Sequence, residues 1–148
     1  MSMSVHRFIL ATALTAASLP AIALCPRGHP SVAAEAAAAP LIVTARIVQQ
    51  RQLFEDASDP EGVTGTIYSA EVTSWLKGDS PPQIEIYSEN TSSRFPMDVQ
   101  SEYVLWLFKD GTWYFVDSCG NSTGLAGHAA VLESVKREQE RIHEGRGD

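Results

Sequence analysis

Residues 103–120, with the sequence YVLWLFKDGTWYFVDSCG, predict a β-hairpin. Two apolar segments meet at Lys109, Asp110 and Gly111, and Asp-Gly between alternating hydrophobic segments is the strongest short-range hairpin signal. The first segment is apolar at successive positions, which is typical of a strand buried on both faces, so we expect Trp106 to lie in the interior. We expect the second segment to run as a strand up to Cys119.

Three further strands are predicted upstream of this hairpin. Their apolar and polar side chains alternate with the period of two that strands show; the segments are 41–49 (LIVTARIVQ), 66–76 (TIYSAEVTSWL) and 83–88 (QIEIYS). Residues 51–65 have the composition of an exposed loop. Residues 89–100 are interrupted by Pro96 and predict a connection, with Phe95 and Met97 turned inward.

Helices are predicted on either side of the strands. Residues 31–39 are rich in alanine, with Ser31 as the N-cap and Pro40 as the stop. Residues 126–144 have the apolar spacing of an amphipathic helix. We therefore predict a mainly β (α+β) domain in which five strands close into a barrel, because closure removes exposed edge strands. The alternative is an open five-stranded sheet backed by the terminal helix.

The first 23 residues predict an export signal. A basic start precedes an apolar run at 8–18 that is too short to span a bilayer, and Ala21-Ile22-Ala23 fits a small-x-small cleavage site. The predicted organisation is a signal peptide at 1–23, a single domain at 24–144 and a flexible tail at 145–148. The expected location is the periplasm or the medium. A lipoprotein is less favoured, because Leu24 precedes Cys25 where a small residue is expected.

Charge and hydropathy restrict the partners. The chain has 11 Lys+Arg against 18 Asp+Glu, a net charge of −7, and no basic stripe. Such a surface disfavours nucleic acid and anionic lipid. No segment after the signal is apolar for long enough to cross a membrane. We expect a monomer without stable membrane insertion.

The chain has two cysteines, Cys25 and Cys119, and we expect them to pair. An oxidising compartment favours a disulfide, which would fasten the N-terminal arm to the hairpin. The alternative is a zinc site that adds His29, since Cys-x3-His is a suitable ligand spacing. A fourth ligand is missing, and His128 and His143 lie too far apart along one helix to share a metal. Both histidines are expected at the surface, and no metal or cofactor is predicted.

The residue types of a hydrolase occur without the context that a hydrolase needs. Cys119, Asn121 and His128 are the residue types that a cysteine hydrolase uses. Ser118, Asp117 and His128 are the residue types of a serine hydrolase triad. A disulfide would consume the thiol, and no nucleophile-elbow sequence is present. The sequence therefore predicts a protein that is not an enzyme.

Several segments together resemble the netrin-like family, which includes the tissue inhibitors of metalloproteinases (TIMPs). They are a cysteine just after the predicted cleavage site, the strand LIVTARIVQQ, a strand running into Trp75-Leu76-Lys77-Gly78, the strand EYVL, and YFVDSCG before the last helix. The resemblance covers about residues 25–136. It implies a barrel of the oligonucleotide/oligosaccharide-binding (OB) type and a role in binding proteins.

The sequence departs from this family in two places. Family members often have Cys-x-Cys at the N-terminus and a further cysteine before the fourth strand, whereas this chain has Arg27 at the first position and no cysteine before Tyr103. Animal inhibitors of the family chelate the zinc of their target enzyme with the amine and carbonyl of an N-terminal cysteine. With Leu24 ahead of Cys25, that geometry is not expected here.

The sequence thus predicts an exported, non-catalytic module that binds a protein partner, with proteinase-inhibitor-like action as a less favoured variant. Residues of the arm and of the hairpin are expected to form the contact: Leu24, Cys25, Pro26, Arg27, Asp110 and Trp113. Trp113 is the strongest single candidate, because a tryptophan beside a turn is expected to be exposed. The alternative is an envelope protein that binds a small ligand or a glycan through exposed aromatic side chains, drawn from Trp75, Tyr87, Trp113 and Tyr114.

Overall fold

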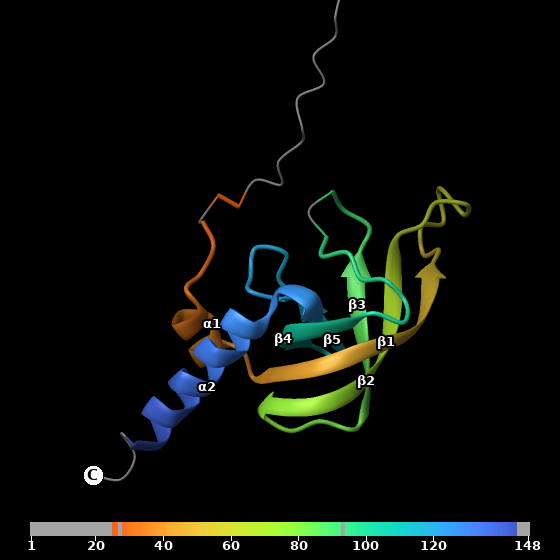
Figure 1. Cartoon of the computed structure of the whole chain (residues 1–148). Helices are drawn as coiled ribbons and strands as arrows, with labels where there is room; N and C mark the ends of the chain where they lie inside the picture. The colour runs from red at the N-terminus through yellow and green to blue at the C-terminus, as the bar shows by residue number, and fades with distance from the viewer. Residues whose placement is uncertain (1–24, 27, 93, 145–148) are drawn as a thin grey trace, which may run out of the picture.

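A computed structural model describes residues 25, 26, 28–92 and 94–144 (Figure 1). The elements in chain order are α1 (Val32–Ala38), β1 (Leu41–Leu53), β2 (Gly65–Lys77), β3 (Gln83–Glu89), β4 (Glu102–Asp110), β5 (Trp113–Val116), β6 (Thr123–Gly124), the 3-10 turn η1 (Leu125–Gly127) and α2 (Ala129–Glu144). The predicted signal peptide and tail, together with Leu24 and Arg27, lie outside the described residues. Strand accounts for 42% and helix for 20%, so the mainly β class is confirmed.

Five strands form a closed ring in the order β1-β2-β3-β5-β4, with β4 returning to β1 (Figure 1). On one edge β1 pairs with β2, and on the other its residues Leu41 through Arg46 pair antiparallel with Leu107 through Glu102 of β4. The ring is weakest between β3 and β5, where the two strands share the single parallel pair Ile86–Tyr114. The predicted five-stranded closure is confirmed, and the open-sheet alternative is wrong.

The first strand is longer than its hydrophobic pattern predicts. β1 continues to Leu53, so the expectation that the loop begins at residue 51 is wrong. Its polar residues Gln50, Arg51 and Gln52 still pair with β2. A register shift between Ile47 and Gln49 marks a bulge, which bends the strand and changes which residues share a face. The connection between the two strands is thereby reduced to residues 54–64.

Two apolar clusters lie on opposite faces of β4. Tyr103, Leu105 and Leu107 point into the ring, whereas Val104 and Trp106 lie under the helices. Trp106 is fully buried, as predicted. The remaining buried members of the interior cluster come from strands β1, β2 and β3 and from the β3–β4 connection. They are Leu41, Val43, Ala45, Ile47, Tyr68, Ala70, Val72, Ile84, Ile86 and Met97. The inward positions of Met97 and its neighbour Phe95 confirm that expectation as well.

The hairpin turn lies one residue later than predicted. Asp110 pairs with Trp113 as the last rung of the ladder, which leaves Gly111 and Thr112 as the loop. Gly111 has a φ of +57°, which fits the two-residue turn that places glycine at its first central position. β5 also ends at Val116, so the expectation that Cys119 closes this strand is wrong. Asp110 is therefore a strand residue at the rim of the ring.

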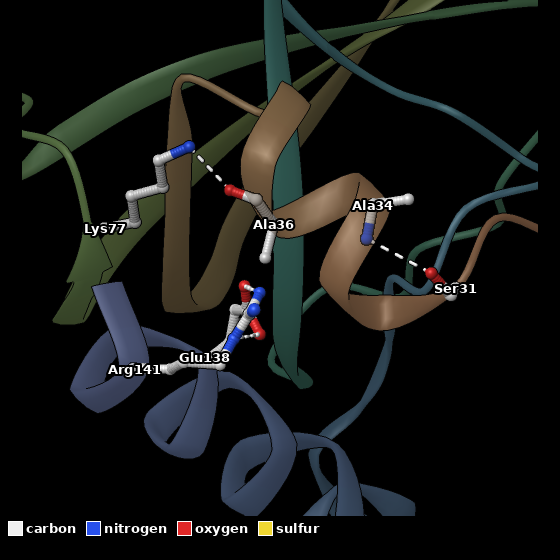
Figure 2. A network of polar contacts seen from close by, with 6 residues as sticks. All are labelled: Ser31, Ala34, Ala36, Lys77, Glu138 and Arg141. Atoms are coloured by element: carbon white, nitrogen blue, oxygen red, sulfur yellow. Dashed lines mark hydrogen bonds and ion pairs between the residues drawn. The ribbon is translucent and has the colours of Figure 1, made fainter. Parts of the chain in front are cut away.

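The short helix α1 is held at both ends (Figure 2). Its N-cap is Ser31, whose Oγ accepts a hydrogen bond from the Ala34 N–H at 3.2 Å, as predicted. At the other end, Lys77 Nζ donates to the carbonyl oxygens of Ala36 at 2.6 Å and Ala39 at 2.7 Å. These are carbonyls that a helix terminus leaves without partners. A two-turn helix is marginal by itself, so its position depends on these contacts and on the burial of Ala36 and Ala39.

The long helix α2 covers α1 and the outer face of β4. Its Val135 is fully buried in the second cluster, and its Glu138–Arg141 ion pair points toward α1 (Figure 2). The helix begins at Ala129 rather than 126, because residues 125–127 form a separate 3-10 turn. Neither α1 nor α2 has the length and apolar run needed to cross a bilayer.

The surface position expected for His128 is not found, and the one expected for His143 stays a prediction. His128 is half-buried, and its buried Nδ1 has no hydrogen-bond partner among the described residues. The side chain of His143 lies outside the described part of the chain.

Candidate functional site

The N-terminal arm is bound covalently to the turn after β5. Cys25 and Cys119 form a disulfide that joins positions 94 residues apart, as predicted. His29 Nδ1 lies 2.9 Å from the carbonyl oxygen of Cys119 and adds a second contact between arm and turn. Because both sulfurs are in the disulfide, neither is a thiolate for zinc or for nucleophilic attack. In the described residues, no group of three or more His, Cys, Asp or Glu side chains is placed to hold a metal ion.

A buried carboxylate, not foreseen from the sequence, fixes the same turn. Glu35 of α1 is 4% exposed, and its Oε2 accepts hydrogen bonds from the backbone N–H and from the side-chain amide of Asn121, each at 2.6 Å. The same amide donates to the Pro30 carbonyl at 3.1 Å. A Cβ at Gly120 would collide with the Glu35 carboxylate. Two features of the sequence could have indicated this contact. One is the single glutamate in the alanine-rich helix, and the other is Gly-Asn directly after Cys119.

The hydrolase constellations are not assembled. Cys119 is in the disulfide, and Asn121 is bound to Glu35 and Pro30. His128 Nδ1 has no hydrogen-bond partner in the part of the chain that the structure describes, so this atom makes no hydrogen bond to Ser118. Ser118 instead lines a cleft on the barrel.

This cleft, of about 580 Å³, lies where β3 and β5 separate. β3 lines it with Tyr87, Ser88 and Glu89, and the facing wall comes from β5 and the residues that follow it. Because the two strands share a single pair at Ile86–Tyr114, they leave room beyond it. Aromatic side chains form much of the lining: Tyr87, Phe95, Trp113 and Phe115.

Trp113 is half-buried and already has a cation over its ring. The guanidinium carbon of Arg51 lies 5.9 Å from the ring centroid, within the range of a cation–π interaction. Arg51 comes from the part of β1 that the sequence assigned to a loop. Its guanidinium also lies 3.9 Å from Glu85 of β3, and both side chains are 49% exposed. Trp113 is therefore accessible, though less exposed than a residue at a turn would be.

Two further aromatic rings are positioned by specific neighbours. Phe115 is 38% exposed and stacks on Phe108 at a centroid distance of 5.7 Å. The ring of Tyr87 lies across Gly65 of β2, where an added Cβ would be 2.6 Å from the ring. Gly65 therefore allows the tyrosine to lie flat on the sheet.

The lining of the cleft is acidic. Among the described lining residues, three carboxylates, Glu89, Asp110 and Asp117, accompany one basic residue, Arg94, which is hydrogen-bonded to the side chain of Asn90. The pKa of Tyr87 is raised from its usual value, first by partial burial and then by the negative charges of Glu89 and Glu55. The described lining of the cleft therefore carries more negative than positive charge.

A second, smaller hollow of about 340 Å³ adjoins the cleft. It is lined by the arm residues Cys25, Pro26, Gly28 and Pro30 and by Asp117 and Cys119. Asp117 lines both the cleft and this hollow. The structure thus brings the two predicted contact regions together, the arm through Cys25 and Pro26 and the hairpin through Asp110 and Trp113.

Two of the other predicted aromatic candidates lie elsewhere. Trp75 is 42% exposed, but its Nε1 donates to Ser80 Oγ at 3.0 Å, outside the cleft. Tyr114 packs against the interior cluster, with Lys109 Nζ 5.5 Å from its ring centroid. Tyr87 and Trp113 remain as the aromatic candidates that the cleft contains.

The chain matches no protein-family model, and no curated protein sequence matches it.

Proposed function

We propose that the chain is an exported, non-catalytic module that binds another protein at the cleft between β3 and β5. The observation that supports this most directly is the shared wall at Asp117, which joins the cleft to the hollow of the disulfide-bound arm. Because they share this residue, one partner could contact both hollows. Trp, Tyr and Arg side chains are the residues that most often dominate the energy of protein interfaces; Trp113 and Tyr87 line the cleft, and Arg51 lies over the Trp113 ring.

The ring supports the OB-type part of the proposal. OB barrels are five-stranded and partly open, and this ring is closed firmly between β1 and β4 but barely between β3 and β5. Membership of the netrin-like family is proposed on the same ground and on the sequence resemblance. The disulfide and the lack of a membrane-spanning helix among the described residues are compatible with export.

A second candidate function is binding of a small ligand or a glycan. The cleft volume lies within the usual range of small-molecule sites, and the lining combines aromatic rings with hydroxyl-bearing residues such as Ser88 and Ser118. Sugars commonly stack on exposed aromatic faces, so Trp113 would again be central. This function differs from protein binding in the class of occupant but not in the site.

Site-specific photo-crosslinking separates these functions. We would place p-benzoylphenylalanine at Phe115, inside the cleft, and at Trp75 as a matched exposed aromatic position outside it. In cells that export the chain, protein binding predicts a discrete crosslinked protein from position 115 and none from position 75. Equal crosslinking from both positions, or none from either, would contradict a protein site at the cleft. Binding to an oligosaccharide panel that is lost in Trp113→Leu would then support the glycan function.

A further inference from the structure

We propose that the cleft takes a cation: an extended segment of the partner protein that places a lysine or arginine side chain against Trp113, a lining residue whose ring already has Arg51 over it. This inference rests on the proposed protein-binding function and specifies the chemistry of the partner. It is supported by the contacts of Arg51, by the charge of the cleft and by the adjoining arm hollow.

Arg51 occupies the Trp113 face without being firmly held there. Its ion pair with Glu85 is 3.9 Å long and half-exposed on both sides, and surface pairs of this kind contribute little to stability. Tryptophan is the best aromatic acceptor for a cation. The Trp113 ring therefore already accepts the guanidinium of Arg51. A cation of the partner could displace this weakly held guanidinium. Arg51 acts as an internal substitute for the ligand.

The charges around Trp113 favour a positive occupant over a neutral or negative one. Among the described residues, Glu89, Asp110 and Asp117 line the cleft against one basic lining residue, Arg94, so the lining has more negative than positive side chains. Partial burial first, and the negative charges of Glu89 and Glu55 second, raise the pKa of Tyr87 in the same lining. An incoming lysine or arginine would gain attraction from these carboxylates as well as from the ring.

The form of the occupant follows from the two hollows. A free amine or a single side chain would fill part of the 580 Å³ cleft and leave the 340 Å³ arm hollow empty. An extended chain that passes Asp117 can use both. Its basic residue would lie at Trp113, and its following residues would lie along Cys25 and Pro26.

The first test measures peptide binding to the full, disulfide-bonded chain. The probes are fluorescein-labelled decapeptides of glycine, serine and valine whose central residue is lysine, arginine, glutamine or glutamate. We expect the lysine and arginine peptides to bind at least about fivefold more tightly than the glutamine peptide, and the glutamate peptide to bind most weakly. Equal affinity for all four, or a preference for glutamate, would overturn the inference.

Substitution of Arg51 gives the sharper test, because the two possible roles of Arg51 predict opposite changes in peptide affinity. If Arg51 competes with the ligand, Arg51→Gln tightens binding of the lysine peptide by about two- to fivefold. If instead Arg51 contacts the partner directly, the same variant weakens binding. The matched control is Arg46→Gln, since Arg46 lies on the same strand, is also 49% exposed and pairs with Glu102 away from the cleft. This control should leave peptide affinity unchanged.

Substitutions of the ring separate a cation–π contact from simple packing. Trp113→Phe keeps an aromatic face, whereas Trp113→Leu keeps apolar bulk without one. We expect the preference for lysine over glutamine to survive in the first variant and to disappear in the second. If both variants behave alike, the ring is not a cation acceptor and the inference fails.

The failure of this inference can be told apart from failure of the proposed function. Suppose that a protein crosslinks from position 115 and that its contact segment has no lysine or arginine. This result would support the docking site and contradict the proposed cation. Absence of that crosslink together with absence of peptide binding removes both.

Discussion

Glu35 and Asn121 lie 86 residues apart, and the Glu35 carboxylate accepts two 2.6 Å hydrogen bonds from Asn121, one from the backbone and one from the side chain. This contact ties α1 to the turn that contains Cys119. It is noncovalent, it is buried, and it lies beside the disulfide. The position of the arm hollow therefore has two independent supports.

Loss of the Glu35 carboxylate should lower the free energy of unfolding. Glu35→Ala leaves two donors of Asn121 without partners, and we expect a loss of about 2–4 kcal/mol in urea unfolding with the disulfide intact. Glu35→Gln keeps one acceptor oxygen and should lose less. The control is Glu133→Ala on the exposed side of α2. Equal stability of all three variants would mean that the contact contributes nothing.

Replacement of Lys77 should loosen α1. Lys77→Met keeps the apolar stem but removes the ammonium that binds the carbonyls of Ala36 and Ala39. We expect a loss of about 1–2 kcal/mol, since hydrogen bonds from a charged donor are worth more than neutral ones. Amide hydrogen exchange should show faster exchange in residues 35–39 than in the strands. Lys136→Met, on the exposed face of α2, is the control and should show neither change.

The disulfide can be tested by intact mass and by unfolding. We expect the exported protein to begin at Leu24, with no alkylation until it is reduced. A chain that begins at Cys25 would instead revive the zinc-chelating inhibitor mechanism if unmodified, and a lipid-sized increment would indicate a lipoprotein. On the chain-entropy description, removing a link of 94 residues costs up to about 4–5 kcal/mol. We expect Cys25→Ser with Cys119→Ser to unfold at a correspondingly lower urea concentration.

Tyr87 should titrate above its ordinary pKa of 10.0. The difference between the ultraviolet titrations of the wild type and Tyr87→Phe isolates its curve. Glu89→Gln should lower the midpoint, but not to the ordinary value, because partial burial is the larger cause. Since the folded chain holds this proton more tightly than the unfolded chain, its contribution to stability is complete below pH about 10 and is lost as pH rises through the folded pKa. A midpoint at or below 10.0 would contradict the negative potential that we infer for the cleft.

Alternating or continuous apolar segments were sufficient to predict the five ring strands, but not where β1 ends. Gln50, Arg51 and Gln52 have no hydrophobic pattern, and they are strand because β2 offers a pairing edge beside them. The hairpin was predicted from Asp110-Gly111 between two apolar segments. Its turn moved by one residue because Gly111, rather than Asp110, takes the first central position.

The candidate site was predictable only in part. Asp110, Trp113 and Cys25 were identified because turns and cysteines are visible in a sequence. Phe115 was missed, because the cleft arises where β3 separates from β5, and that separation depends on how the whole ring closes. Glu35 was missed because its burial is decided by a turn that lies far away in the chain.

The pairing of β1 with β4 has a consequence for the order of folding. As the chain is made from its N-terminus, β1, β2 and β3 can pair as soon as they appear, but the other edge of β1 has no partner until residues 102–107 follow. An unpaired edge is the part of a sheet most prone to join another chain. Cys25 has no cysteine to pair with over the same interval. Because Cys119 is the second of the two cysteines in the sequence, no wrong disulfide can form within one chain. The hazard during synthesis is pairing between two chains, and the final third of the sequence ends it by closing the ring and supplying the second cysteine together.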